Sequence, residues 1–150
     1  MSVIWFVGQP GSGKTTLCKT MLKYMGEDTF HIDGDDLRNL FENKDYSVVG
    51  RRKNIQLAQQ ITQYLHSKGK NVLVSLVSPY KDQREEFKIE LGVCIVEVYV
   101  HTSEIRGRED YFVKEFEPPT DNYIDIDTTD ISVDVCVNLI LEYEKNSCGG

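Results

Sequence analysis

The feature that most constrains this chain is the stretch GQPGSGKTT at residues 8–16, which follows the apolar run VIWFV at residues 3–7. Its spacing, G-x-x-x-x-G-K-T, is typical of a loop that binds phosphate groups. Glycine adopts backbone angles that other residues avoid, so consecutive N–H groups can turn inward around an anion. A dinucleotide-binding fingerprint would need glycine where Thr16 stands. The sequence therefore predicts a site for the phosphates of a nucleotide.

Each position of this loop has an expected task. Lys14 is expected to reach the β- and γ-phosphates of ATP, and Thr15 to offer its hydroxyl to Mg²⁺. The segment from Lys14 to Met25 reads as a helix, whose N-terminus adds free N–H donors and positive dipole at the same point. A glycine-rich turn that matches by chance is the alternative, but it leaves the flanking strand and helix unexplained. The residues expected to bind the nucleotide are Gly8, Gly11, Ser12, Gly13, Lys14, Thr15 and Thr16.

Short apolar runs alternate with longer helical patterns along the rest of the chain. Strands are expected at residues 3–7, 29–33, 71–77, 94–100 and 123–127, and helices at 14–25, 36–43, 47–67, 82–91 and 131–144. Strands that alternate with helices form a parallel sheet with helices on both faces. The expected fold class is therefore α/β with a five-stranded parallel sheet, in a single domain over residues 1–145 with a flexible tail at 146–150.

Composition argues against several other classes of function. The net charge of −7 disfavours general nucleic-acid binding, which needs a basic surface. No apolar run is long enough to span a membrane, and no secretory signal is visible. The four cysteines form neither a C-x-x-C pair nor a zinc pattern; Cys18, Cys94 and Cys136 are expected in the core, and Cys148 in an exposed tail. These features predict a cytoplasmic protein.

Two aspartates follow the second predicted strand. In an open parallel sheet, ligands bind beyond the carboxyl ends of the strands, so Asp33 and Asp35 are expected beside the phosphate loop. Phosphoryl transfer needs a metal that bridges the phosphates and a group that accepts or orients the proton of the attacking hydroxyl. One aspartate is expected to help hold Mg²⁺, and the other to act as the base. The alternative for Asp35 is a helix cap, and that role is compatible with the first.

Three polar residues near predicted helix starts are candidates for holding a second substrate. Arg38 lies three residues after Asp35, and Arg51 and Asn54 repeat that spacing in the next helix. An arginine at a helix start opposes the helix dipole, which favours an anionic ligand there; a solvated helix face is the alternative. Tyr46 precedes the same helix and either stacks on a base or forms a hydrophobic staple.

The order of these motifs resembles the adenylylsulfate kinase family. GQPGSGKTTL is similar to the family's phosphate loop, IDGDDLR to its D-G-D-N-x-R, YSVVGRRKNI to its F-S-x-x-D-R-x-E-N-I, LVSPYKDQR to its I-S-P-Y-x-x-x-R, and IVEVYVHTS to its F-V-E-V-Y-V-x-x-P. The resemblance implies the three-layer fold of P-loop kinases. It also implies Mg²⁺-dependent transfer of the γ-phosphate of ATP to the 3′-hydroxyl of adenosine 5′-phosphosulfate.

The resemblance also implies roles for individual residues. Lys14, Asp33 and Asp35 would be catalytic, with Asp35 favoured as the base, and Thr15 and Asp33 would serve the metal. Arg108 would lie near the base of ATP. The residues that would bind the acceptor are Asp35, Arg38, Tyr46, Arg51, Asn54, Val77 and Ser78.

The segment at residues 101–122 departs from the family, whose lid is longer and carries K-G-L-Y and G-F-T-G motifs. Lys114 is the candidate for the family's lid lysine, and Phe112 and Phe116 are the candidates for its aromatic over the acceptor base. This difference leaves two alternatives open: a kinase of the same fold that acts on another small hydroxyl acceptor, or a nucleotide-binding module without transfer. The family often pairs, so a homodimer is expected, with no nucleic-acid or membrane partner.

Overall fold

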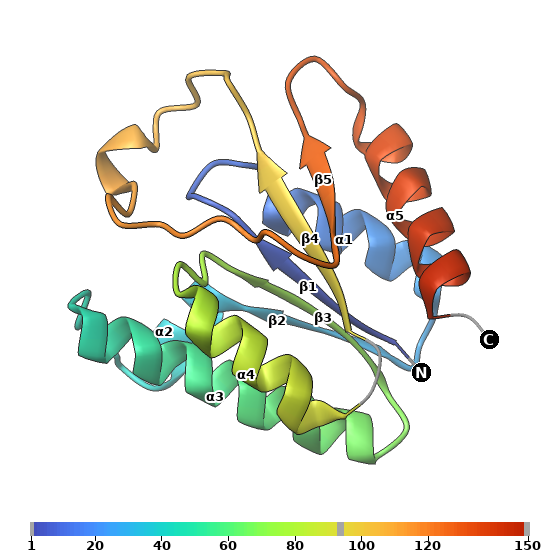
Figure 1. Ribbon diagram of the computed structural model, residues 1–150, viewed down its shortest axis with the longest axis horizontal. Helices are drawn as coiled ribbons and strands as arrows, with labels where there is room; N and C mark the ends of the chain where they lie inside the picture. The colour runs from blue at the N-terminus through green and yellow to red at the C-terminus, as the bar shows by residue number, and fades with distance from the viewer. Residues whose placement is uncertain (1, 93–94, 149–150) are drawn as a thin grey trace.

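The computed structural model describes residues 2–92 and 95–148, and its centre is a five-stranded sheet whose neighbouring strands are all parallel (Figure 1). The strands are β1 (Val3–Val7), β2 (Thr29–Asp33), β3 (Asn71–Leu76), β4 (Ile95–His101) and β5 (Tyr123–Asp127). Their order across the sheet is β2-β3-β1-β4-β5. The predicted α/β class and the parallel sheet are confirmed.

Helices cover both faces of this sheet and complete three layers (Figure 1). The helices are α1 (Lys14–Met25), α2 (Gly34–Leu40), α3 (Val48–Ser67), α4 (Lys81–Leu91) and α5 (Val133–Ser147), with a short 3₁₀ turn η1 (Glu109–Tyr111). One buried cluster joins the sheet to α1 and α5, and a second joins it to α2, α3 and α4. The layers follow from the continuous apolar strands, because a sheet with both faces buried needs apolar residues on both.

The central strand β1 shows how the two cores share one sheet. Its side chains alternate between faces, so Ile4 and Phe6 belong to the cluster under α1 and α5. Val3, Trp5 and Val7 belong to the cluster under α2, α3 and α4. Since β1 leads directly into the phosphate loop, this buried strand gives the loop a rigid base.

Several element ends differ from the prediction. The helix expected at 36–43 begins at Gly34, because the Asp33 side chain caps it, and β3 ends at Leu76 rather than at residue 77. α5 runs to Ser147, three residues beyond the expected end at 144, so it takes in the first two residues of the expected tail. The division into one domain over 1–145 and a flexible tail stays a prediction.

The cysteines follow the prediction in two cases. Cys18 and Cys136 are buried in the core cluster under α1 and α5, which confirms their expected place. The expectation of an exposed Cys148 is wrong: this residue is half-buried and packs against the same cluster, because the longer α5 carries it there. Cys94 lies outside the described residues.

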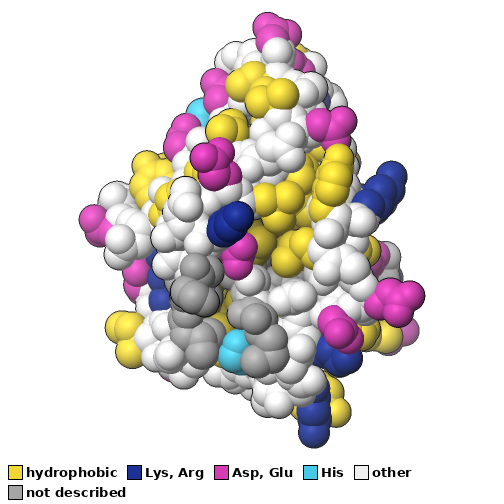
Figure 2. Space-filling model, turned by 90° about the vertical axis from the view of Figure 1, so that its right-hand side faces the viewer, with side chains coloured by type: hydrophobic (Ala, Val, Ile, Leu, Met, Phe, Trp, Pro, Cys, Tyr) yellow, Lys and Arg dark blue, Asp and Glu magenta, His cyan; other side chains and the backbone are white. Residues whose placement is uncertain are grey.

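The side of the molecule that carries α5 keeps apolar side chains at its surface (Figure 2). Ile131, Val135 and Leu139 are spaced four residues apart and are 45%, 49% and 47% exposed. Such a face is compatible with pairing of two copies, which stays a prediction. Within residues 2–92 and 95–148, no helix has the length and apolar character needed to cross a membrane.

Candidate active site

The phosphate loop joins β1 to α1 and presents open backbone donors. A side chain at Gly8 would bring its Cβ to within 2.2 Å of the Val100 carbonyl oxygen, so only glycine fits there. Gly13 has a φ of 112°, in the left-handed region that favours glycine. The first backbone hydrogen bond of α1 runs from the Leu17 N–H to the Gly13 carbonyl, at 3.0 Å. The preceding N–H groups have no partner in the helix and can receive an anion: those of Lys14, Thr15 and Thr16.

The Lys14 ammonium is folded back over this loop. Its Nζ donates to the carbonyl oxygens of Gly8 at 2.8 Å and Gln9 at 2.9 Å. Burial lowers the pKa of Lys14 to about 8, although the carboxylates of Asp33 and Asp35 act in the opposite direction. A buried cation whose hydrogen bonds all go to neutral oxygens is poised to gain from a phosphate anion. The loop therefore fits the triphosphate of ATP.

This pKa predicts how nucleotide binding depends on pH. Below about pH 8 Lys14 is already protonated in the free protein, so its charge is available to the phosphates. Above that pH the free lysine is neutral and binding must take up a proton, so affinity for an ATP analogue should fall by up to about tenfold per pH unit. Calorimetric titrations at rising pH would measure this slope, and the Lys14→Met protein should lack it. Equal slopes in both proteins would contradict the assignment.

The carboxylate of Asp33 is held by four hydrogen bonds. Its Oδ1 accepts from the hydroxyls of Thr15 at 3.1 Å and Ser75 at 2.9 Å. Its Oδ2 accepts from the backbone N–H groups of Asp35 at 3.2 Å and Asp36 at 3.4 Å, which makes Asp33 the N-cap of α2. The structure thus uses Asp33 to tie the phosphate loop, β3 and α2 together.

The Thr15 hydroxyl is arranged to receive a cation. Because its proton is given to Asp33, the oxygen lone pairs are left for another partner. Within the described part of the chain, no group of three or more His, Cys, Asp or Glu side chains could hold a metal. Mg²⁺ is usually bound in such sites through one or two protein oxygens together with water and substrate phosphates. Thr15 and Asp33 fit that ion: the Thr15 hydroxyl oxygen would contact it, and Asp33 orients that hydroxyl by accepting its hydrogen bond.

Asp35 follows Asp33 by two residues and lines the same cleft. It lies in the first turn of α2, and its side chain is exposed. In the portion of the chain that the structure describes, its carboxylate makes no hydrogen bond or ion pair. The alternative prediction that Asp35 caps α2 is wrong, since the cap is Asp33. Asp35 is therefore the aspartate that is free to accept a proton.

One cleft of about 540 Å³ joins the phosphate loop to the residues expected to bind the acceptor. It is bordered by the loop, the start of α2, the start of α3, the end of β3 and residues 108–113. All of the predicted acceptor residues line it: Asp35, Arg38, Tyr46, Arg51, Asn54, Val77 and Ser78. The structure thus brings two sequence-distant groups of predicted residues to one place, beside Lys14 and Thr15.

Arg38 and Tyr46 form a pair at the outer wall of this cleft. The Arg38 guanidinium lies 4.0 Å from the centre of the Tyr46 ring. Its Nη1 donates to the carbonyl oxygens of Asn43 and Asp45, both at 3.1 Å, which braces the turn before α3. Tyr46 is 62% exposed and does not staple the helix against the core. The Tyr46 ring and the Arg38 guanidinium stacked on it therefore form a flat part of the cleft wall.

Arg51 and Asn54 lie in the first two turns of α3. Among the described residues, the Arg51 guanidinium has no hydrogen-bond or ion-pair partner, although it sits at the positive end of the helix. Asn54 is 4% exposed, and its amide donates to the Gly34 carbonyl at 3.4 Å, which joins α3 to the start of α2. An unpaired cation at a helix start favours an anionic ligand over a solvated face.

Val77 and Ser78 close the floor of the cleft after β3. Val77 is half-buried, whereas Ser78 is 1% exposed and has a φ of 46°. The Ser78 hydroxyl accepts a hydrogen bond from the Trp5 indole at 2.9 Å, and its carbonyl accepts one from Arg84 at 2.6 Å. Ser78 is therefore held by the core, and the side chain that it offers to a ligand is already engaged.

A second cleft of about 440 Å³ adjoins the other side of the loop. Arg108 lines both clefts, as expected for a residue near the nucleotide. The sequence interpretation missed Arg106, whose Nη1 donates to the carbonyls of Gly11 at 3.1 Å and Ser12 at 3.0 Å. Thr128, whose hydroxyl donates to the Ser12 carbonyl at 2.7 Å, was expected on the rim after the fifth strand but was not among the predicted site residues. Its contact with the loop agrees with the rule that polar residues at strand ends gather there.

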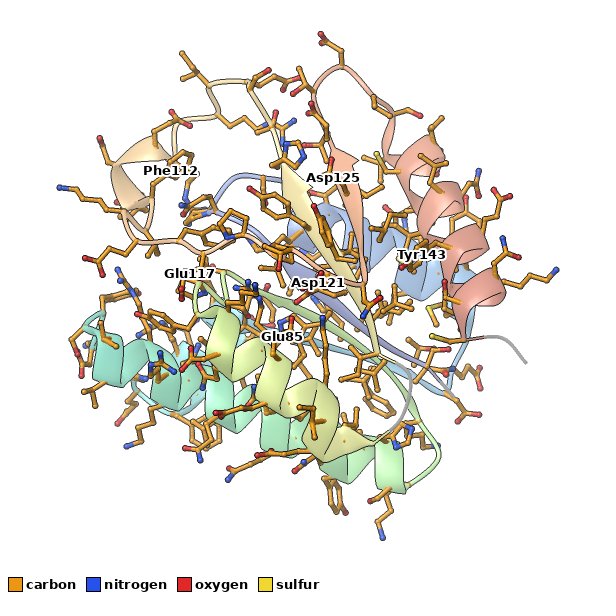
Figure 3. The ribbon with its side chains drawn as sticks, viewed as in Figure 1. Glu85, Phe112, Glu117, Asp121, Asp125 and Tyr143 are labelled. Atoms are coloured by element: carbon orange, nitrogen blue, oxygen red, sulfur yellow. The ribbon has the colours of Figure 1, made fainter. Side chains whose placement is uncertain are left out.

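The three lid candidates lie in different places on the segment between β4 and β5. Phe112 lines the first cleft and lies on the η1 side of the segment (Figure 3). Phe116 instead stacks on Tyr99, with ring centres 5.9 Å apart, so it is not the aromatic of the cleft. Lys114 is exposed and lines neither cleft, and its role as the family's lid lysine stays a prediction.

Comparison with known proteins agrees with this geometry. Residues 1–111 match the adenylylsulphate kinase family. The adenylyl-sulfate kinase of Staphylococcus haemolyticus is 32% identical over 168 residues, covering 96% of this chain and 84% of that protein. That of Buchnera aphidicola subsp. Schizaphis graminum is 33% identical over 105 residues, covering 67% of this chain but only 50% of that protein.

A solved structure shares the fold over nearly the whole length. The Mycobacterium tuberculosis APS kinase CysC, in complex with AMPPNP and APS, superposes with a TM-score of 0.79. The match covers 94% of this chain and 95% of that one, at 22% identity. On the family match and the identity to the staphylococcal enzyme, this chain belongs to the adenylylsulphate kinase family.

Proposed function

We propose that this protein transfers the γ-phosphate of ATP to the 3′-hydroxyl of adenosine 5′-phosphosulfate. The observation that carries the proposal is the single cleft in which the phosphate loop faces the Asp35 carboxylate and the Arg51 guanidinium, neither of which has a partner within residues 2–92 and 95–148. Family membership supports the reaction class. The solved relative that contains AMPPNP and APS supports the two substrates.

The chemistry needs little beyond positioning and charge. Lys14 and the N–H groups at the start of α1 would bind the phosphates and stabilise the charge that spreads over the moving group. Asp35 would accept the proton of the 3′-hydroxyl as its oxygen bonds to the γ-phosphorus, the bond to the β-phosphate oxygen breaks and ADP leaves. Bound Mg²⁺ would supply charge neutralisation between the phosphates, with Thr15 and Asp33 holding it.

The acceptor would be held by the far side of the cleft. Arg51 and Arg38 present cationic groups that suit the phosphosulfate. Tyr46 and Phe112 border the same cleft from opposite segments, the turn before α3 and the stretch after η1, and would enclose the adenine. Val77 and Ser78 would form the floor beneath it.

A second acceptor class is favoured by one observation. The segment that lines the cleft contributes Arg108 and Asp110 but no lysine, so its charged side chains add no net positive charge. A less anionic acceptor, such as a nucleoside or a modified base, would need less positive charge there. ADP release with adenosine 5′-phosphosulfate, with a panel of nucleosides and nucleotides, and without acceptor would separate the proposals at matched Mg²⁺. Tight ATP binding without turnover on any acceptor would indicate a binding module.

Arg51→Ala should weaken use of the acceptor while leaving ATP binding nearly unchanged. Among the described residues the guanidinium has no partner, and the variant would lose one charge-assisted contact with the phosphosulfate, so kcat/KM for adenosine 5′-phosphosulfate should fall about thirtyfold to two-hundredfold. Initial rates with the acceptor varied at saturating ATP would measure the change.

Arg52→Ala provides the matched control. This neighbouring arginine pairs with Asp82 at 3.1 Å and is absent from the lining of the cleft. It should leave the acceptor kinetics within about twofold, because exposed ion pairs contribute little. If the two variants behave alike with adenosine 5′-phosphosulfate, the acceptor assignment is wrong.

A further inference from the structure

The side chain of Gln9 joins the phosphate loop to the segment between β4 and β5. Its Nε2 donates to the Val113 carbonyl at 2.8 Å, and its Oε1 accepts from the Val113 N–H at 2.9 Å. One side-chain amide thus satisfies both backbone groups of a residue 104 positions away. Val113 itself is 7% exposed and lines the first cleft.

The stretch around Val113 is held to the rest of the protein at three places. Before η1, Arg106 binds the carbonyls of the phosphate loop. After Val113, the Glu117 N–H donates to the Pro79 carbonyl at 2.9 Å, and Arg84 donates to the Glu117 carbonyl at 2.5 Å. Figure 3 shows Glu117 beside the start of α4, well separated from Phe112. The third contact lies between these two, where the Gln9 side chain fixes Val113.

Residues 110–113 depend on this contact for their place over the acceptor side of the cleft. Asp110, Tyr111 and Phe112 line the cleft, yet Tyr111 and Phe112 are 69% and 43% exposed, so burial alone does not hold them. A leucine at position 9 would fill similar volume but would leave the buried N–H and carbonyl of Val113 without partners. The free-energy cost of these unpartnered groups would fall if residues 110–113 moved away from the phosphate loop, because water would then bind them.

We propose that Gln9 is a positioning residue, which holds residues 110–113 as the roof of the acceptor site. The proposal rests on the proposed function, because it takes the first cleft as the acceptor site. Gln9 also offers its own carbonyl to the Lys14 ammonium at 2.9 Å. Gln9 therefore contacts Lys14 through its backbone carbonyl and contacts Val113 in the roof through its side chain.

Gln9→Leu tests this role, with Gln59→Leu as the matched control. The Gln59 amide also donates to a backbone carbonyl, that of Gln83 at 3.3 Å, but it lies outside both clefts. Trypsin cleavage within residues 106–114, mapped by mass spectrometry, should become about tenfold faster in Gln9→Leu and stay unchanged in Gln59→Leu. This measurement needs no substrate, so it tests the clamp independently of the reaction.

Steady-state kinetics test the second half of the proposal. In Gln9→Leu the KM for adenosine 5′-phosphosulfate should rise roughly five- to twentyfold while kcat and the Kd for ATP stay within about twofold. Gln9→Glu keeps the acceptor for the Val113 N–H but sets a carboxylate oxygen against the Val113 carbonyl, so its cleavage rate and KM should also rise above those of the wild type.

The outcomes separate the clamp from the reaction. Cleavage in Gln9→Leu at the wild-type rate, in a protein with an unchanged melting temperature, would overturn the proposal. Faster cleavage with an unchanged acceptor KM would overturn it as well, since the roof would then not touch the acceptor. If the wild type itself transfers no phosphate to adenosine 5′-phosphosulfate, the proposed function fails, and the cleavage rates alone then support or overturn the clamp.

Discussion

Lys14→Ala should lower kcat for ADP formation about a thousandfold. The ammonium is 8% exposed and lies over the loop that receives the phosphates. Removing it leaves the N–H groups of the loop in place. It takes away the buried cation that would stabilise the negative charge on the transferred phosphoryl group. Single-turnover rates with ATP and adenosine 5′-phosphosulfate, both saturating, would measure the loss.

The stability of this variant should not fall with its activity. Burial disfavours the charged lysine in the folded protein, so at neutral pH its removal relieves a cost and the melting temperature should stay level or rise. Lys19→Ala, on the exposed face of the same helix, is the control and should keep full activity. Transfer within about tenfold of wild type in Lys14→Ala would show that the loop does not bind the phosphates as assigned.

Most of the fold could be predicted because its signals are local. The run at residues 3–7 is apolar throughout, and in the structure it is the buried central strand with a core on each face. The helix ends were less predictable because they depend on side-chain geometry. α2 begins two residues earlier than expected, since Asp33 turns its own carboxylate onto the N–H groups of the next residues.

The residues of the candidate site also differ in how they could be predicted from the sequence. The glycines, Lys14 and Thr15 were identified by the spacing of one motif, and the aspartates by their place directly after a predicted strand. Arg38, Arg51 and Asn54 were identified by their unusual places on helices and by resemblance, and the cleft contains all three. What they do there stays a prediction, which the variants above test.

The contacts that the sequence could not reveal are those between distant segments. Arg106 grips loop carbonyls that precede it by 95 and 94 positions, and Gln9 meets Val113 across 104. Neither residue occupies a diagnostic place in its own motif: Gln9 fills a variable position of the loop, and Arg106 lies in a charged stretch. Such pairings are set by how the β4–β5 segment folds back over the loop, which local propensity does not specify.

Asp35→Asn should lower kcat by about a hundredfold to ten-thousandfold with little change in the KM values. Asparagine keeps the shape of the side chain but cannot accept the proton of the attacking hydroxyl. Because the Asp35 carboxylate has no partner within the described residues, the substitution breaks no contact of the folded protein, and its melting temperature should stay within a few degrees of wild type.

Asp36→Asn is the control, because it removes a neighbouring carboxylate that does not line the cleft. It should keep kcat within about twofold, since only charge at a distance changes. A loss in both variants would point to the local field rather than to a base. If Asp35→Asn keeps kcat within about tenfold, proton acceptance would have to pass to Asp33. Both oxygens of Asp33 already accept hydrogen bonds from Thr15, Ser75 and the start of α2, and Asp33 is less exposed than Asp35.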